Sequence, residues 1–203
     1  GTTTSITNLG NARGADGRIS LREAIIAANN TANGGTPDKI VFDIAGSGPH
    51  SINVASALPS ITGRVIIDAT TEPDFAGTPV IELNGNNVIG GVRGLVLGAG
   101  SDGSTIRGLI INRFSGTGIE ISGSNNHTIQ GNWIGLNAAG TAAAGNGVKG
   151  IYALNATGLL IGTNADGSND AAERNVISGN AQQGIYFDNV DNSTISGNYI
   201  GTN

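Results

Sequence analysis

The chain has 203 residues and a net charge of −5 at pH 7; only 12% of its residues are charged, and 34 are glycine. An acidic chain without a Lys/Arg cluster lacks the surface that neutralises phosphates, so we expect no nucleic-acid partner. The absence of cysteine excludes disulfides, thiolate zinc sites and thiol catalysis. No apolar run approaches the roughly 20 residues of a membrane span, so direct membrane insertion is not expected.

Residues 1–39 are predicted to form an N-terminal capping segment. Ser20 and Glu23 are spaced as in a capping box, in which serine and glutamate side chains bond backbone groups at a helix N-terminus. A helix over about 21–29 follows, with Leu21 and Ile25 on one apolar face. We expect this helix to cover the first coil of a repeat stack, because a bare coil would expose its core and a free strand edge.

Residues 40–203 are predicted to form the repeat stack itself. Apolar residues alternate with polar or small ones in short segments, which is the period-2 pattern of strands. The first and least regular strands are expected at Ile40–Asp43, Ser51–Val54, Val65–Asp68 and Val80–Leu83.

Two repeated motifs set the length of one coil. A Gly-Ile motif at Ile119, Ile151 and Ile185 precedes a second isoleucine, at Ile129, Ile161 and Ile195, by ten residues each time. Leu95 and Ile119 are 24 residues apart, and Ile106 and Ile129 are 23 apart; the later coils also carry loops at Ala138–Gly147 and Asn164–Arg174. Such a unit accommodates three short strands per turn. The predicted fold class is all-β, a right-handed single-stranded parallel β-helix with an N-terminal α-helical cap.

The stacked register predicts how the repeats pack. Equivalent residues of successive coils lie about 4.8 Å apart, so the isoleucines form a continuous apolar axis and asparagines form hydrogen-bonded columns at the turns. We therefore expect aspartate at Ile129 or Ile195 to disrupt the fold, because it would bury an unpaired charge.

The segment Ile19–Ile25 resembles the Cys-Ser-Leu-Arg-Glu-Ala segment that opens many large bacterial surface and outer-membrane-associated proteins, with Ile19 in place of the cysteine. Gly131–Gly135 and Asn175–Asn180 are similar to the parallel β-helix repeats that follow that segment. The resemblance implies an extracellular or cell-surface location. Some members of this group look like adhesins or anchors, and the fold is shared with polysaccharide lyases and hydrolases.

The chain stops at Asn203, immediately after a complete repeat and without a capping segment. We expect that the parent protein continues beyond this point, or that the open C-terminal coil packs against another chain, including a second copy.

The sequence contains no recognisable catalytic set. Pectin hydrolases that share this fold carry Asp-Asp, Gly-His-Gly and Arg-x-Lys motifs, and none of these three motifs occurs in the chain. Asp43 and Asp68 end two similar strands 25 residues apart and could stack as a carboxylate pair or calcium site, with Glu82 nearby; the favoured interpretation is that each bonds turn amides. His127 is expected to be a surface turn residue.

No metal ligand set or other cofactor site is predicted; besides Asp43 and Asp68, a second segment could bind calcium. Asp16, Gly17 and Glu23 match the second half of an EF-hand loop, but Ala12 and Gly14 occupy positions where ligand oxygens belong. Glu23 is already explained by the capping box.

The candidate ligand-binding residues are Glu120, Tyr152, Tyr186 and Asp188. If Ile119 and Ile121 point inward, residue 120 and its equivalents point outward, and two tyrosines stack on successive coils. They could bind a sugar ring or a protein partner, or could only stabilise the sheet face. Trp133 and Tyr199 share another column, for which packing is expected.

These observations favour a non-catalytic structural or adhesive module of a large secreted or cell-surface bacterial protein, with carbohydrate or a surface protein as partner. The alternative is a divergent polysaccharide lyase or glycoside hydrolase of the β-helix type.

Overall fold

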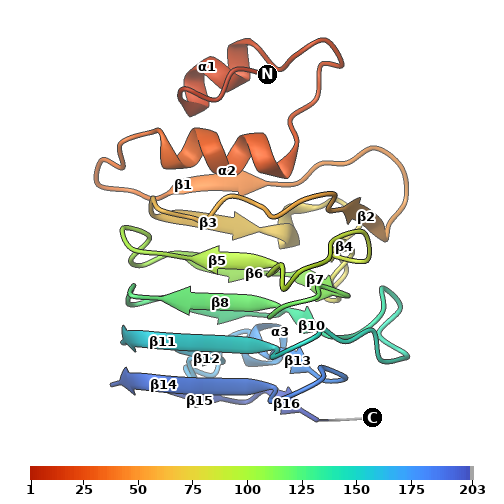
Figure 1. Cartoon of the computed structure of the whole chain (residues 1–203), viewed down its shortest axis with the longest axis vertical. Coiled ribbons are helices and arrows are strands. Elements are labelled where there is room, and N and C mark those ends of the chain that lie inside the picture. The colour runs from red at the N-terminus through yellow and green to blue at the C-terminus, as the bar shows by residue number, and fades with distance from the viewer. Residues whose placement is uncertain (202–203) are drawn as a thin grey trace.

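The computed structural model describes residues 1–201 as a stack of coils beneath a helical cap. Figure 1 shows the helices α1 (Ile6–Asn11) and α2 (Leu21–Asn29) at the N-terminal end, with the strands in successive layers below them. Thr202 and Asn203, the last two residues of the predicted repeat Thr194–Asn203, lie outside the described residues.

Three parallel sheets run along the stack. We call them sheets A, B and C. Sheet A contains, in spatial order, β1 (Asp38–Val41), β3 (Val65–Asp68), β6 (Thr105–Arg107), β9 (Thr128–Gln130), β12 (Leu160–Gly162) and β15 (Thr194–Ser196). Sheet B contains β2 (His50–Asn53), β4 (Ile81–Asn84), β7 (Leu109–Asn112), β10 (Trp133–Ile134), β13 (Val176–Ile177) and β16 (Tyr199–Ile200). Sheet C contains β5 (Leu95–Leu97), β8 (Ile119–Ser122), β11 (Ile151–Thr157) and β14 (Ile185–Asp191). The predicted parallel β-helix with three strands per coil is confirmed.

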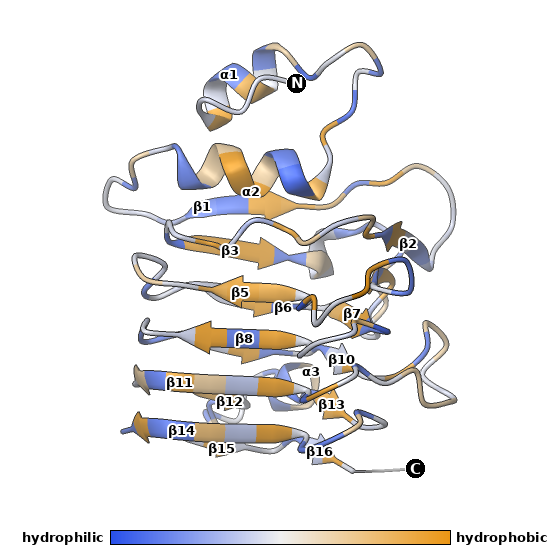
Figure 2. Ribbon diagram, in the orientation of Figure 1, coloured by the Kyte–Doolittle hydropathy of each residue, from blue (hydrophilic) through white to orange (hydrophobic). Residues whose placement is uncertain are grey.

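The isoleucine column of sheet A is the clearest consequence of the repeat. Neighbouring strands pair Ile40 with Ile67, Ile67 with Ile106, and so on through Ile129 and Ile161 to Ile195. All are buried except Ile195, which is 45% exposed on the last coil. Figure 2 shows orange, blue and orange segments along β8, in agreement with the buried Ile119 and Ile121 on either side of the half-buried Glu120.

Glycine permits the close approach of successive coils at the Gly-Ile motif. A Cβ atom on Gly118 would lie 2.8 Å from the carbonyl oxygen of Gly150 and 2.9 Å from a methyl carbon of Ile134. Real Cβ atoms essentially never approach so closely, so any larger residue would push the coils apart. The repeated glycine is therefore a packing requirement of the corner before sheet C.

The cap is joined to the first coils by both apolar and polar contacts. The capping box of Ser20 and Glu23 is present, and Leu21, Ile25 and Ala28 belong to the same buried cluster as the strands below. The guanidinium of Arg22 donates to the carbonyl oxygens of Ser56 and Ala57, at 2.7 and 2.8 Å. Helix α2 thus closes the apolar end of the stack.

Local features differ from the sequence predictions where no repeat fixes them. β1 lies two residues earlier than expected, and β2 and β4 are shifted by one residue. The sequence did not predict helix α1, the 3₁₀ turn η1 (Ala69–Thr71) or helix α3 (Asp170–Glu173), which lies within the second predicted loop.

Candidate functional site

The outward column of sheet C brings together the residues selected from the sequence. The strand register places Val96, Glu120, Tyr152 and Tyr186 directly beside one another on β5, β8, β11 and β14. The neighbouring inward columns are apolar: Ile119, Ile151 and Ile185 on one side, Ile121, Ala153 and Phe187 on the other. The buried columns hold the outward side chains in a fixed row, which we call the tyrosine column.

The two tyrosines and Lys149 form one cluster. The ring centroids of Tyr152 and Tyr186 lie 5.7 Å apart, with the rings tilted by 38°. The Lys149 ammonium nitrogen is 5.0 Å from the Tyr152 centroid and 4.9 Å from the Tyr186 centroid, within cation–π range of both. A ligand at this face therefore meets a cation between the rings as well as two phenol groups.

Two carboxylates flank this cluster. Tyr152 donates its hydroxyl proton to Oδ2 of Asp188 over 3.4 Å. Burial of the hydroxyl group, followed by the charge of Asp188, raises the pKa of Tyr152 above its usual value. On the preceding coil Glu120 forms an ion pair with Arg93. The face thus presents cationic donors, Arg93 and Lys149, and anionic acceptors, Glu120 and Asp188, along four coils.

Lys149 and Arg93 were missed in the sequence, although a signal for them exists. Each immediately precedes a glycine of the repeated corner, Gly150 and Gly94, and so occupies the same position in its coil. A tabulation of the residue before each repeated glycine would have placed both beside the tyrosine column.

His127 is completely buried, so the prediction of a surface turn residue is wrong. Its Nε2 atom is hydrogen-bonded to the Ser124 hydroxyl, which lies 2.9 Å from the hydroxyl of Ser101 on the coil above. Burial lowers the pKa of His127 to about 4. A serine hydrogen-bonded to a histidine suggests nucleophilic chemistry. However, Ser101, Ser124 and His127 have no exposed surface, so these residues join successive coils and cannot meet a substrate.

Asp43 and Asp68 do not stack. The register pairs Asp68 with Val41 and with Arg107, and places Asp43 beyond the end of β1. Asp68 forms an ion pair with Arg107 and accepts the Thr70 backbone N–H at 3.1 Å, in line with the predicted turn-amide role. Against the effect of burial, the bond from Arg107 lowers the pKa of Asp68.

Glu82 lies on sheet B, away from both aspartates, in a polar cluster. It is hydrogen-bonded by the Ser51 hydroxyl, by Asn112 Nδ2 at 2.7 Å and by Arg113 Nη1 at 3.2 Å. Burial opposes ionisation here, but the bonds from Ser51 and Asn112 dominate and lower the pKa of Glu82. Glu82 and Arg113 of this cluster line an open groove of 630 Å³ together with Asn53, Asn84, Asn86 and Asn137.

The remaining sequence candidates lie away from the tyrosine column. Trp133 and Tyr199 share one column of sheet B with Val176 between them, but Tyr199 is 49% exposed, and its hydroxyl accepts from Arg174. The loop after β10 lies against Trp133, because a Cβ atom on Gly140 would meet its indole ring. In the calcium-like segment, Glu23 bonds the Ser20 backbone and Asp16 accepts from the Arg18 N–H. Within residues 1–201 no three His, Asp or Glu side chains are grouped to hold a metal ion.

Comparison with protein families agrees with the stacked coils. A family model described as "Right handed beta helix region" matches residues 74–203, more than half of the chain. A search of curated proteins gave no match. Over the part of the chain that the structure describes, no helix is long and apolar enough to cross a membrane.

Proposed function

Because the chain belongs to the right-handed β-helix family, we propose that it is a non-catalytic structural and adhesive module of a large secreted or cell-surface protein. In this proposal the solenoid is the rigid support, and the tyrosine column is the surface that engages a carbohydrate or a surface protein. The observation that carries the proposal is the exact register of Glu120, Tyr152 and Tyr186, with Lys149 and Asp188 against the rings.

The chemistry of the face favours a hydroxyl-rich ligand. Lys149 lies over both rings, so a ligand meets phenol hydroxyls, the ring edges and two carboxylates more readily than an uncovered ring face. Hydroxyl groups of a saccharide can donate to Glu120 and Asp188 and accept from Lys149. The fixed spacing between coils suits an extended chain with repeated groups.

The structural roles of the acids support a non-catalytic module. Glycoside hydrolysis needs two carboxyl groups about 5–9.5 Å apart, one of them with a raised pKa. Asp68 is paired with Arg107, Glu120 with Arg93, and Glu82 is held ionised by its hydrogen bonds. A carboxyl group held ionised is a poor general acid, because it has no proton to donate.

A divergent polysaccharide-cleaving enzyme is the second candidate, and one observation favours it. Glu82 and Arg113 line a groove with four amide side chains, an arrangement that could bind a saccharide beside a base and a cation. A catalytic role would require Glu82 to reach the substrate, although its side chain is only 4% exposed.

The location outside the cell is part of the proposal. It rests on the likeness of residues 19–25 to the segment that opens bacterial surface proteins, and on a chain without cysteine that depends on no disulfides. Detection of the tagged parent protein in cell-surface and culture fractions would test it.

A glycan-array screen of the wild-type chain tests the binding role, with reducing-sugar and unsaturated-product assays on the same polysaccharides. Wild type should bind at least one glycan without releasing product. Truncation of Tyr152 and Tyr186 to alanine should weaken binding at least about tenfold, as expected when central aromatic contacts are lost. Tyr199→Ala is the matched control, since Tyr199 is exposed on another sheet. Product release that depends on Glu82 would instead support the enzyme.

A further inference from the structure

The first strand of sheet A has a free backbone edge. Asp38 N–H donates to the carbonyl oxygen of Arg64, and Phe42 N–H donates to the Thr71 hydroxyl. Backbone groups alternate in direction along a strand, so those of Lys39 and Val41 point away from β3. Within residues 1–201 these two N–H groups and their carbonyls make no hydrogen bond to a turn, a loop or a cap.

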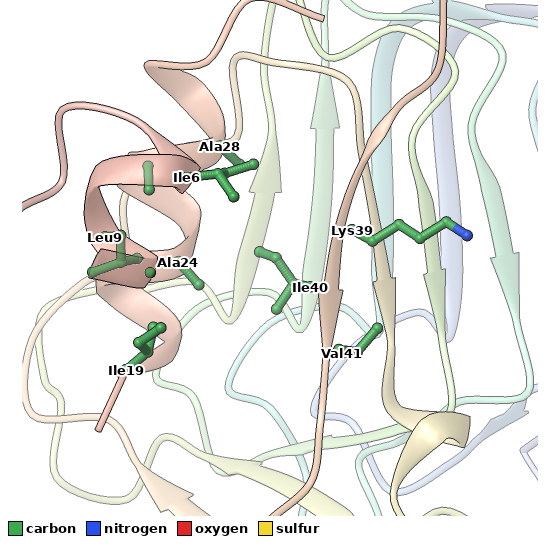
Figure 3. A pocket seen from close by; sticks show the side chains of 10 residues that line it. Ile6, Leu9, Ile19, Ala24, Ala28, Lys39, Ile40 and Val41 are labelled. Carbon is green, nitrogen blue, oxygen red and sulfur yellow. The ribbon is translucent and has the colours of Figure 1, made fainter. Parts of the chain in front are cut away.

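An apolar groove lies over this edge. Figure 3 shows Ile40 directed toward the two helices, while Lys39 and Val41 project to the other side of the strand. The groove has a volume of 240 Å³, and its helical wall is formed by Ile6, Leu9, Ala24 and Ala28. A second hollow of 580 Å³ continues from it, because Ile19 and Val41 line both.

The helices cover the core but leave apolar side chains beside the edge exposed. Ile25 and Ala28 of α2 are buried in the central cluster, whereas Val41 and Ile19 remain 58% and 42% exposed. An unpaired strand edge is a template for another strand, and natural proteins usually block it with proline, charge or a covering segment. Here apolar side chains line the approach to the edge.

We propose that β1 is a docking site for an extended segment of a partner protein, which adds to sheet A as a further strand. The free N–H and C=O groups of Lys39 and Val41 call for a peptide backbone, which a lipid tail or a helix cannot supply. The partner residue beside Ile40 would enter the apolar groove beneath α1, and its neighbours would face solvent. The segment therefore carries apolar residues at alternate positions.

Charge defines the partner further. Arg13 and Arg18 line the second hollow, and Lys39 projects beside the first. Of the nearby carboxylates, Glu23 is paired with the N-terminal amine, Asp38 accepts from Asn33, Asp16 accepts from the Arg18 backbone N–H, and Asp43 lines the hollow. Residues 1–43 contain four Lys/Arg and four Asp/Glu, so this end lacks the acidic excess of the whole chain, which has 10 and 15. Acidic residues beyond the apolar positions would pair with Arg13 and Arg18.

Panning of a random 12-residue peptide library on the folded chain tests the proposal, followed by amide exchange measured by NMR with the selected peptides. The selected peptides should alternate apolar residues and include acidic ones. They should protect the amide protons of Lys39 and Val41, which are free in the unbound chain.

Two variants give the decisive comparison. Val41→Pro removes an N–H on the free edge without touching the β1–β3 ladder, and proline is tolerated at such positions. It should weaken peptide binding at least tenfold. Asn53→Pro is the matched control: β2 bonds to β4 through His50 and Val54, so the Asn53 N–H also points to a free edge, on another sheet. Arg18→Glu provides a second test that leaves the strand intact, and it should weaken binding of acidic peptides severalfold.

Three results would overturn the proposal: equal binding to wild type and Val41→Pro, selected peptides that protect no β1 amide, or no enriched peptide. Binding to phosphatidylglycerol vesicles without such protection would also overturn it, since a lipid surface does not need a strand edge. None of these outcomes depends on the tyrosine column, so failure here would leave the proposed function standing.

Discussion

Asn132 and Asn175, 43 positions apart in sequence, are stacked and joined by two hydrogen bonds. The backbone N–H and the Nδ2 group of Asn132 both donate to Oδ1 of Asn175, at 2.9 and 3.0 Å. Asn175 in turn donates from Nδ2 to the Ile129 carbonyl oxygen and to Oδ1 of Asn198, both at 2.8 Å. Asn132 and Asn175 are completely buried. Asn132, Asn175 and Asn198, which we call the asparagine column, therefore supply hydrogen bonds at the corner between sheets A and B.

Replacement of Asn175 by alanine should destabilise the solenoid. It removes the acceptor of two buried donors of Asn132 and the donor to Ile129. A buried polar group left unsatisfied costs about 1–3 kcal/mol, so we expect a loss of about 3 kcal/mol in the free energy of unfolding. Urea denaturation measures it. Asn87→Ala, at an exposed turn, is the control and should change stability by less than about 0.5 kcal/mol. Equal effects at both positions would contradict a role for the asparagine column.

The repeats allowed the regular part of the fold to be predicted. The spacing of Ile106, Ile129 and Ile161 determines which residues stack, and the same register places Glu120, Tyr152 and Tyr186 in one row. Register between coils follows from periodicity, because a slip of one residue would turn every apolar side chain outward.

The errors lie where periodicity is absent or where several coils meet. β1 has no repeat to fix its register. The alternative in which Asp43 stacks on Asp68 is therefore wrong, because β1 places Val41 beside Asp68. The burial of His127 depends on Ser101 and Ser124 from two coils. The comparison with Ser193, 66 residues on, suggested a surface position, but the register places buried Leu159 on the next coil beside His127. Such contacts are properties of the folded stack and not of one segment.

Aspartate should have different effects at two positions of the isoleucine column. Ile129 has no exposed surface, so Ile129→Asp buries a charge without a partner and should prevent folding. Ile195 lies on the last coil and is 45% exposed, which corrects the expectation that both substitutions are equivalent. Ile195→Asp should leave the far-UV circular dichroism of a β-helix and lower the unfolding free energy only by about 1 kcal/mol. Equal loss of structure in both variants would contradict this register.

Asp188→Asn should lower the pKa of Tyr152 without restoring its ordinary value. Burial is the larger cause of the raised pKa and persists in the variant, whereas the charge of Asp188 is removed. Absorbance titration of tyrosinate measures the change, with Tyr152→Phe used to identify the signal among the three tyrosines. Asp191→Asn, also exposed on β14, is the matched control. An unchanged titration in Asp188→Asn would contradict the contact between the carboxylate and the phenol.

The chain is expected to self-associate through its C-terminal coil. Ile195, Tyr199 and Ile200 are 45%, 49% and 46% exposed there. Neighbouring exposed apolar side chains favour contact with a second copy. Sedimentation velocity should show mass increasing with concentration, and Ile200→Lys should reduce it. Val41→Lys, at the opposite end, is the control; an equal reduction there would assign self-association to the cap.

Acid should destabilise the fold through His127. Its pKa is lowered from 6.5 to about 4 by burial, so the unfolded chain binds this proton between those values and the folded chain does not. The contribution of neutral His127 is therefore complete above pH 6.5 and declines as the pH falls toward 4, by about 3 kcal/mol in total at 1.36 kcal/mol per pH unit. Urea unfolding at pH 7, 6, 5 and 4.5 measures the slope. His127→Gln keeps a polar group near Ser124 but cannot titrate, so its slope over this range should be much flatter. A wild-type slope that persists in His127→Gln would assign the acid sensitivity to other groups.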